Sequence, residues 1–290
     1  SLHGLEYHGQ LNFMKAGIFY ADRITTVSPS YAREITTHEQ GCGLDGLLRE
    51  RGAFLSGILN GVDDAVWNPA IDTAIAASYS PARMAGKAQC KAALQNMTGL
   101  EVSDNKPLFA VVSRLTEQKG LHLILAGLGE ITARGGQVVV LGSGDAWMEN
   151  SFRDAAAADP ANVAVRIGYD EGFAHQIMAG CDVIMVPSRY EPCGLTQLYG
   201  LKYGALPLVR RVGGLADTVV DCSLENLAEG KASGMVFDEF SVDGFTLAVR
   251  RAFALWARPK DWKAVRSHGM QQDYGWEVAA RQYVSLYRSL

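Results

Sequence analysis

A single carboxylate, Glu191, lies in a setting suited to ligand binding within the stretch SRYEPCGLTQLYGLKYG (188–204). It follows the apolar run CDVIMVP, which is typical of a buried strand, and precedes a glycine and a segment with helical spacing. The carboxyl end of a parallel strand that opens into a helix is where open α/β sheets bind ligands, and a helix N-terminus attracts anions. An acid beside an anion site is explained if it binds hydroxyl groups next to that anion. A sugar joined to a phosphate has both features.

The residues after Glu191 supply hydrogen-bond donors for such an anion. The backbone N–H groups of Gly194, Leu195 and Thr196 begin the predicted helix, and the Thr196 hydroxyl is a further donor. The structural alternative is that Glu191 only favours a helix N-terminus, but the Pro-Cys-Gly that follows it indicates a tight turn under a ligand. We expect Cys193 to be small and buried, not nucleophilic, because no histidine lies near it in the sequence.

Two cations, Arg114 and Lys119, lie five residues apart in SRLTEQKG (113–120), a loop that opens a predicted helix. Both side chains can converge on one anion at the helix N-terminus. The alternative is a pair of solvated cations, but a positive charge in the first turn opposes the helix dipole, and this small cost favours anion binding.

Three further motifs are weaker. Tyr169 ends the predicted strand 163–169, where a ring can stack on a base, although a surface tyrosine there is equally common. LGSGDAW (141–147) lacks the third glycine of a dinucleotide fingerprint, so a tight strand-to-helix turn is favoured over cofactor binding. RRVGGLADTV (210–219) places a basic pair before two glycines, and ligand binding and solvated arginines have comparable weight.

The composition is that of a globular chain of one or two domains, with 290 residues, 48% hydrophobic and 20% charged. A net charge of −4 gives no basic field for nucleic acid or an anionic membrane, so neither is an expected partner. The five cysteines form no metal-ligand spacing with the histidines, which predicts reduced thiols and a cytoplasmic location. With no D-x-D or His cluster and no complete dinucleotide fingerprint, no metal and no cofactor are expected. No apolar run approaches the ~20 residues of a membrane span.

Apolar runs rich in Val, Ile and Leu alternate with amphipathic segments from Pro107 onward. Such continuous runs are typical of strands buried on both faces, and the alternation predicts an α/β fold with a doubly wound parallel sheet. The expected strands are 107–113, 137–145, 163–169, 181–188, 205–211 and 233–238, with helices between them and more helices after Asp238.

The start of the chain differs, because residues 1–55 read as a helix, one strand and another helix. One strand cannot make a sheet. The chain also begins Ser1-Leu2 without a methionine. Together these features predict that residues 1–55 are the tail of another domain.

Several long motifs resemble bacterial glycogen synthase, the retaining ADP-glucose-dependent glucosyltransferase related to plant starch synthases. They are VVSRLTEQKGLHL, GSGDAWME, the run from IGYDEGF to GGLADTV, and LNGVDDAVWNP, which cover essentially the whole chain. The resemblance implies the GT-B fold of two Rossmann-like domains, and a match to the C-terminal portion of the enzyme. Residues 1–55 would then end the N-terminal, acceptor-side domain, 56–270 would form the nucleotide-sugar-binding domain, and 271–290 a helix that packs toward the N-terminal domain.

The resemblance also implies the catalytic residues, Arg114, Lys119 and Glu191. Arg114 and Lys119 would bind the donor diphosphate and stabilise the charge that develops on ADP as the glucosyl group becomes cationic. No nucleophile is expected, and the leaving diphosphate would help to deprotonate the acceptor, an α-1,4-glucan.

The implied substrate-binding residues surround these three. Tyr169 would stack on adenine, the backbone of Cys193 and Gly194 would hold the glucose with the catalytic carboxylate, and Leu195 and Thr196 would donate to the distal phosphate of ADP-glucose or ADP.

The chain departs from the family pattern in two ways. Tyr199 occupies the position at which related glycosyltransferases carry a second glutamate, so no ribose contact is assigned there. Most of the N-terminal domain is absent, including its lysine-glycine-glycine loop and a histidine, so the chain would supply mainly the donor half of the site. Two alternatives remain open: a non-catalytic nucleotide-sugar-binding module, and a transferase with another donor such as UDP-glucose.

Overall fold

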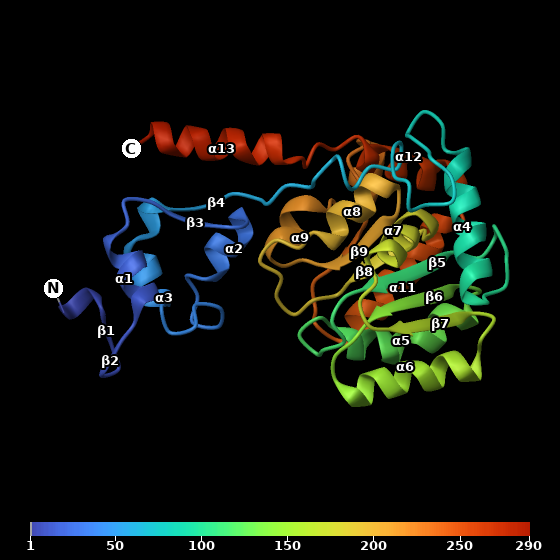
Figure 1. Cartoon of the computed structure of the whole chain (residues 1–290), viewed down its shortest axis with the longest axis horizontal. Coiled ribbons are helices and arrows are strands. Elements are labelled where there is room, and N and C mark those ends of the chain that lie inside the picture. The colour runs from blue at the N-terminus through green and yellow to red at the C-terminus, as the bar shows by residue number, and fades with distance from the viewer. Residues whose placement is uncertain (1) are drawn as a thin grey trace.

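Six parallel strands form the central sheet of this computed structural model, which describes residues 2–290 (Figure 1). The strands are β5 (Leu108–Val112), β6 (Gln137–Gly142), β7 (Val163–Ile167), β8 (Val183–Val186), β9 (Leu206–Arg210) and β10 (Met235–Phe237). Each lies within a range predicted from the sequence. Their spatial order is β7-β6-β5-β8-β9-β10, so the chain reverses its winding direction between β5 and β8. The predicted doubly wound sheet is confirmed, and β5 and β8 mark its switch point.

Helices cover both faces of this sheet. They are α4 (Ala85–Thr98), α5 (Leu121–Ala133), α6 (Ala146–Ala158), α7 (Glu171–Gly180), α8 (Thr196–Tyr203), α9 (Gly213–Thr218), α10 (Leu224–Ala228), α11 (Val242–Trp256) and α12 (Pro259–Met270). The core on one face includes residues of α5, α6 and α11, and the core on the other includes residues of α4, α7 and α8. Helix α4 is absent from the sequence prediction, because its buried face carries Lys87, Lys91 and Gln95 and therefore gives little apolar periodicity.

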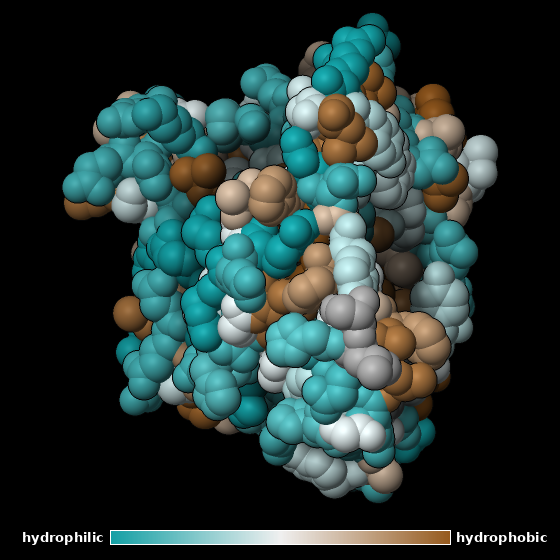
Figure 2. Space-filling model, turned by 90° about the vertical axis from the view of Figure 1, so that its left-hand side faces the viewer, coloured by the Kyte–Doolittle hydropathy of each residue, from teal (hydrophilic) through white to brown (hydrophobic). Residues whose placement is uncertain are grey.

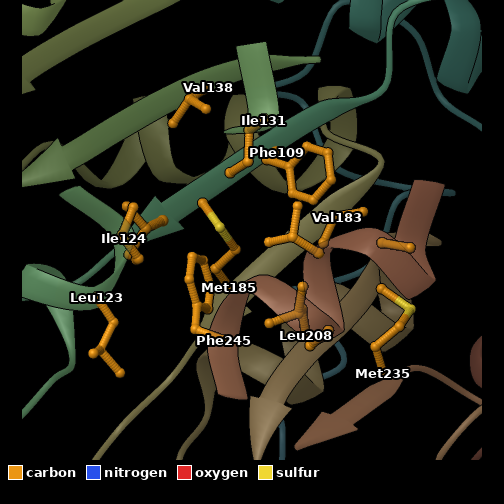
Figure 3. Close-up of a cluster of buried hydrophobic side chains, with 14 of the residues drawn as sticks. Phe109, Leu123, Ile124, Ile131, Val138, Val183, Met185, Leu208, Met235 and Phe245 are labelled. Carbon is orange, nitrogen blue, oxygen red and sulfur yellow. The ribbon is translucent and has the colours of Figure 1, made fainter. Parts of the chain in front are cut away.

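The larger core explains the continuous apolar runs of the strands. Figure 3 shows Phe109 of β5 and Met185 of β8 near Ile124 of α5 and Phe245 of α11. The neighbouring Leu108 belongs to the core on the opposite face. Because successive side chains point to opposite faces of a strand, a sheet covered on both faces needs apolar residues at nearly every position.

A smaller unit precedes the sheet. It contains two 3₁₀ turns (Leu2–Gly4 and Gly52–Phe54), the hairpin β1 (Glu6–Tyr7) and β2 (Gln10–Leu11), helices α1 (Phe13–Tyr20), α2 (Pro29–Glu34) and α3 (Asp45–Glu50), and strands β3 (Ile24–Thr26) and β4 (Leu55–Gly57). The expectation of a single strand here is wrong, because β3 pairs in parallel with β4. The three residues of β4, Leu-Ser-Gly, contain no apolar run that would mark a strand in the sequence.

The last helix, α13 (Trp276–Arg288), leaves the sheet domain and runs beside the smaller unit (Figure 1). Arg23 of that unit donates to the carbonyl oxygen of Ser289 at 3.1 Å. Figure 2 shows brown apolar side chains among mostly hydrophilic ones on the face toward this end of the molecule. The exposed apolar residues of the smaller unit and of α13 include Phe13, Met14 and Tyr287.

Among residues 2–290 the structure contains no helix with the length and apolar character that a membrane crossing needs.

Lys87 of α4 is a buried cation in the sheet domain, with 6% of its surface exposed. Its Nζ donates to the carbonyl oxygen of Ala179 at 2.9 Å, near the C-terminus of α7. Burial lowers the pKa of Lys87 from 10.5 to about 8. Between these two pH values the unfolded chain binds a proton that the folded protein does not, so stability rises with pH in this window and the cost of the buried charge is fully present below pH 8.

We therefore expect the free energy of unfolding of the wild type, relative to that of Lys87→Met, to increase by roughly 1.4 kcal/mol per pH unit above pH 8. Chemical denaturation of both proteins at pH 7, 8, 9 and 10 measures this difference, and the subtraction removes titrations common to both. A difference that does not change with pH would contradict the assignment.

Candidate functional site

Two adjoining cavities lie at the carboxyl edge of the sheet, one of about 380 Å³ at the ends of β5, β6 and β7 and one of about 280 Å³ at the ends of β5 and β8. Both are lined by Val112 and Ser113 at the end of β5 and by Thr196 at the start of α8. This is the switch point of the sheet, where the loops after β5 and β8 turn toward opposite faces and leave a crevice. The loops predicted to carry chemistry therefore meet at one place.

The first cavity contains one of the predicted cations and the predicted aromatic residue. Arg114 and Tyr169 both line it. Arg114 is exposed and forms no ion pair with any of residues 2–290. Tyr169 has 81% of its surface exposed, so its ring is available to a planar ligand. The cavity thus has an unneutralised cation and an aromatic face.

The second cavity contains an ion pair between a buried carboxylate and a partly buried lysine. Lys119 Nζ lies 2.8 Å from Glu191 Oε2, which also accepts a hydrogen bond of 3.0 Å from Ser188 Oγ. Glu191 is only 8% exposed, and a carboxylate with so little solvent needs such partners. Lys119 has three donors, so its ammonium can hold the carboxylate and contact a further acceptor in the cavity.

The turn between Glu191 and α8 presents a row of backbone donors. Gly194 is left-handed, with φ +74°, and Leu195 is right-handed, with φ −108° and ψ −26°. Such a pair of conformations forms a concave nest of N–H groups. Within residues 2–290 the N–H groups of Gly194, Leu195, Thr196 and Gln197 donate to no protein acceptor. Together with the positive end of α8, they form a ready anion-binding site.

Helix α9 supports this turn from behind. The N–H of Gly214 donates to the carbonyl oxygens of Glu191 and Pro192, each at 3.1 Å. A methyl group at Gly213 would come within 1.8 Å of the Glu191 carbonyl oxygen, and one at Gly214 within 2.0 Å of that of Cys193. The Gly-Gly pair singled out in the sequence is therefore required for close backbone packing, and not for direct approach to a ligand.

Helices α9 and α2 cap each other. The carboxylate of Glu34, on α2, accepts from the N–H of Gly213 at 2.7 Å, and that of Asp217, on α9, accepts from the N–H of Ser30 at 2.8 Å. Each carboxylate satisfies a free donor at the N-terminus of the other helix. These contacts join the smaller N-terminal unit to the support of the turn.

The remaining predicted residues have simpler settings. Cys193 is buried, and burial raises the pKa of its thiol. This fits the expectation of a packing residue, not a nucleophile. Arg210 and Arg211 line neither cavity, and Arg211 pairs with Asp238 at 2.7 Å.

A stack of three rings in the wall of the first cavity was not predicted. Trp67 lies between Tyr199 and His175, with ring centroids 3.9 and 3.8 Å away. Asp72 accepts from the Tyr203 hydroxyl and bonds His175 Nδ1, both at 2.6 Å. Trp67 comes from an irregular segment whose sequence shows no periodicity, so only the motif LNGVDDAVWNP marked its neighbourhood.

Residues 2–290 contain no cluster of His, Cys, Asp or Glu side chains with the arrangement of a metal site. The charged side chains that line the two cavities in this part of the chain are Arg114 and Glu171 in the first, and the paired Lys119 and Glu191 in the second.

Two protein families match separate parts of this chain. Residues 95–265 match the family described as glycosyl transferases group 1, and residues 1–50 match the starch synthase catalytic domain. The chain is 61% identical over 291 residues to a glycogen synthase of Francisella tularensis subsp. novicida, and 62% identical over 289 residues to one of Leptothrix cholodnii. Each alignment covers 100% of this chain but only 60% and 59% of the relatives, so the chain spans about three fifths of their length.

Solved structures give the same result for the fold. The catalytic domain of starch synthase IV from Arabidopsis thaliana, bound to ADP and acarbose, is 34% identical with a TM-score of 0.89, covering 96% of this chain and 58% of that one. A sucrose-phosphate synthase from Thermosynechococcus elongatus is 18% identical with a TM-score of 0.63, over 98% of this chain and 63% of that one. The second likeness concerns the fold alone.

The packing of Gly213 gives a test of how the turn is held. We expect Gly213→Ala to lower the free energy of unfolding by about 2–4 kcal/mol, because φ is +47° and the new methyl group meets a backbone oxygen that cannot move freely. In Gly129→Ala, on an exposed face of α5 with no atom within 4 Å, alanine should instead stabilise the helix by about 0.5–1 kcal/mol. Chemical denaturation measures both, and equal effects would contradict the tight packing.

Proposed function

The chain belongs to the glycogen synthases, within the group 1 glycosyl transferases, and we propose that it supplies the donor-binding half of an enzyme that elongates an α-1,4-glucan. The donor is ADP-glucose, and glucose is transferred to the non-reducing end with retention of the anomeric configuration. The observation that carries this proposal is the crevice at the switch point, which combines free backbone donors, two cations and one buried carboxylate.

The diphosphate binds between Arg114, Lys119 and the nest of N–H groups. The N–H groups of Leu195 and Thr196 donate to the distal phosphate, at the positive end of α8. Two phosphates carry more negative charge than one cation can neutralise, which accounts for two cations on one loop. Arg114 has no carboxylate partner within residues 2–290 and is therefore free to bind the donor.

The adenine base of the donor lies against Tyr169 in the first cavity. The tyrosine ring is exposed and can stack on adenine. Trp67 and Tyr199, which line the same cavity, restrict the space left for the nucleoside. The starch synthase IV relative was solved with ADP bound, which supports an adenine nucleotide here.

The glucose of the donor lies in the second cavity, where the Glu191 carboxylate accepts from its hydroxyl groups and the backbone at Cys193 and Gly194 contacts it. An acid next to a diphosphate would normally weaken binding by repulsion. The ion pair with Lys119 removes most of that penalty. Glu191 therefore recognises sugar hydroxyls while its charge remains neutralised.

Transfer proceeds on one face of the sugar. The bond between the anomeric carbon and the phosphate oxygen breaks as the acceptor hydroxyl forms the new bond, and the hydroxyl proton passes to the departing phosphate. Arg114 and Lys119 stabilise the charge that develops on ADP and lower the barrier as well as bind the donor. The acceptor is an α-1,4-glucan, and the enzyme acts in the cytoplasm, as expected for a donor of this class.

The domain roles follow from the same proposal. Residues 1–55 belong to the acceptor-side domain, 56–270 bind the nucleotide sugar, and 271–290 form a helix that packs against the acceptor side. The contact of Arg23 with Ser289 and the exposed apolar residues of the smaller unit support this division.

Calorimetric titration of this chain with ADP-glucose, ADP and UDP-glucose tests the proposal. We expect ADP-glucose and ADP to bind and UDP-glucose to bind more weakly, without transfer of glucose to glycogen by the chain alone. Tighter binding of UDP-glucose would favour the alternative donor. No binding of any of the three would contradict a donor-binding role for this chain.

The variant Glu191→Gln should affect binding of the sugar differently from binding of the nucleotide. We expect affinity for ADP-glucose to fall by about tenfold, because the neutral amide is a weaker acceptor for hydroxyl groups, while affinity for ADP stays equal or rises because Lys119 is released toward the phosphates. Calorimetry with both ligands measures the ratio, and Glu225→Gln, at an exposed position on α10, is the control. An equal loss for both ligands would contradict a contact with glucose.

A further inference from the structure

Gln197 lies behind the turn that presents the backbone donors. Its side chain has 0% of its surface exposed, and its Nε2 donates to the carbonyl oxygens of Cys193 at 3.0 Å and Gly194 at 2.8 Å. Thr218 Oγ1 lies 3.3 Å from Nε2, and its own proton goes to the carbonyl oxygen of Gly214 at 2.6 Å. Carbonyl oxygens only accept. The reversed amide would place its oxygen against two of them, so the orientation is fixed.

These bonds determine where the free N–H groups point. The peptide unit that carries the Cys193 oxygen also carries the N–H of Gly194, and the unit with the Gly194 oxygen carries the N–H of Leu195. In a planar trans peptide the C=O and N–H point in opposite directions, and no peptide of the described chain is cis. A side chain that holds both carbonyls therefore turns both N–H groups away from itself, where no acceptor from residues 2–290 meets them.

The environment of the amide oxygen of Gln197 indicates that this residue is needed for the hydrogen bonds that its Nε2 donates. Gln197 Oε1 is buried and has no hydrogen-bond partner within residues 2–290. A buried acceptor without a partner is destabilising. A methionine fills nearly the same volume without that cost, so packing alone does not explain a glutamine here. The amide nitrogen is what a methionine cannot supply.

We propose that Gln197 is a positioning residue that orients the N–H groups of Gly194 and Leu195 toward the bound donor, that of Leu195 toward its distal phosphate. This rests on the proposed function, because it assumes that a diphosphate occupies the nest. The Gln197 side chain acts through the backbone, because it lies in the wall of the second cavity but has 0% of its surface exposed. Its loss leaves the two peptide units free to rotate, so that a carbonyl oxygen can face the anion and repel it.

Gln197→Met tests the proposal, with Gln95→Met as the matched control. Gln95 is also 0% exposed, and its amide donates to the carbonyl oxygen of Ser103 at 2.9 Å, on α4 and outside both cavities. We expect Gln197→Met to weaken ADP binding by about tenfold or more, and Gln95→Met to lower the melting temperature while leaving ADP affinity within about twofold. Equal ADP affinities for Gln197→Met and the wild type, or equal losses in both variants, would overturn the proposal.

Gln197→Glu adds a readout that a packing role would not give. A carboxylate cannot donate a hydrogen bond, but a protonated carboxyl group supplies one donor. Burial raises the pKa of an acid, so the introduced carboxyl group should become protonated as the pH falls from 8 to about 5. The ADP affinity of the variant relative to the wild type should therefore recover partly over this range. The titratable groups around this position are Glu191, Cys193, Lys119, Asp217 and Tyr274, which both proteins share. A ratio that stays constant with pH would overturn the donor role.

A measurement on the wild type covers the case in which these variants do not fold. The backbone N–H resonances of Gly194 and Leu195 should shift on addition of ADP and become protected from hydrogen exchange. If ADP binds but neither resonance responds, the proposal for Gln197 is wrong while the proposed function stands. If the wild type does not bind ADP at all, the proposed function itself fails.

Discussion

The site depends on one constraint: a run of consecutive backbone N–H groups that includes residues 194–197 has no acceptor within the described chain. Backbone donors left without a partner are unfavourable, and a free turn would rotate to satisfy them. The surrounding contacts prevent this rotation. The N–H of Gly214 binds the carbonyl oxygens of residues 191 and 192, and the Gln197 side chain binds those of residues 193 and 194. Gly213 allows the two backbones to approach closely. The donors are thereby kept for a ligand.

The same contacts extend beyond the sheet domain. Helix α9, which holds the turn, is capped by Glu34 of the smaller unit and in return supplies Asp217 to cap α2. Burial raises the pKa of Glu34, so this carboxylate is held in a partly desolvated interface. The N-terminal unit is therefore attached to α9, the helix that supports the turn after Glu191, and not to a remote part of the surface.

The sequence predicts the sheet well because buried parallel strands leave an unambiguous signal. All six strands follow from apolar runs such as those of β5 and β8, while the strand order, and with it the switch point, comes from the structure. The sequence also brings Arg114, Lys119 and Glu191 to one crevice, since the carboxyl ends of parallel strands share an edge. Their roles toward a ligand stay predictions.

What the sequence could not predict depends on short or irregular segments and on contacts distant in the chain. Strand β4 has three residues, helix α4 carries little apolar periodicity, and Trp67 lies in a segment without periodicity. The Lys119–Glu191 ion pair joins residues 72 positions apart, and neither residue type specifies the other. The Gly-Gly pair was recognised as a site of close approach, but the neighbour proved to be the protein backbone.

A crystal structure of this chain with ADP-glucose tests the central claim most directly. The account predicts the distal phosphate within hydrogen-bond distance of the N–H groups of Leu195 and Thr196, and the glucose against Glu191. A diphosphate bound elsewhere, or a turn whose N–H groups face away from the bound anion, would contradict it.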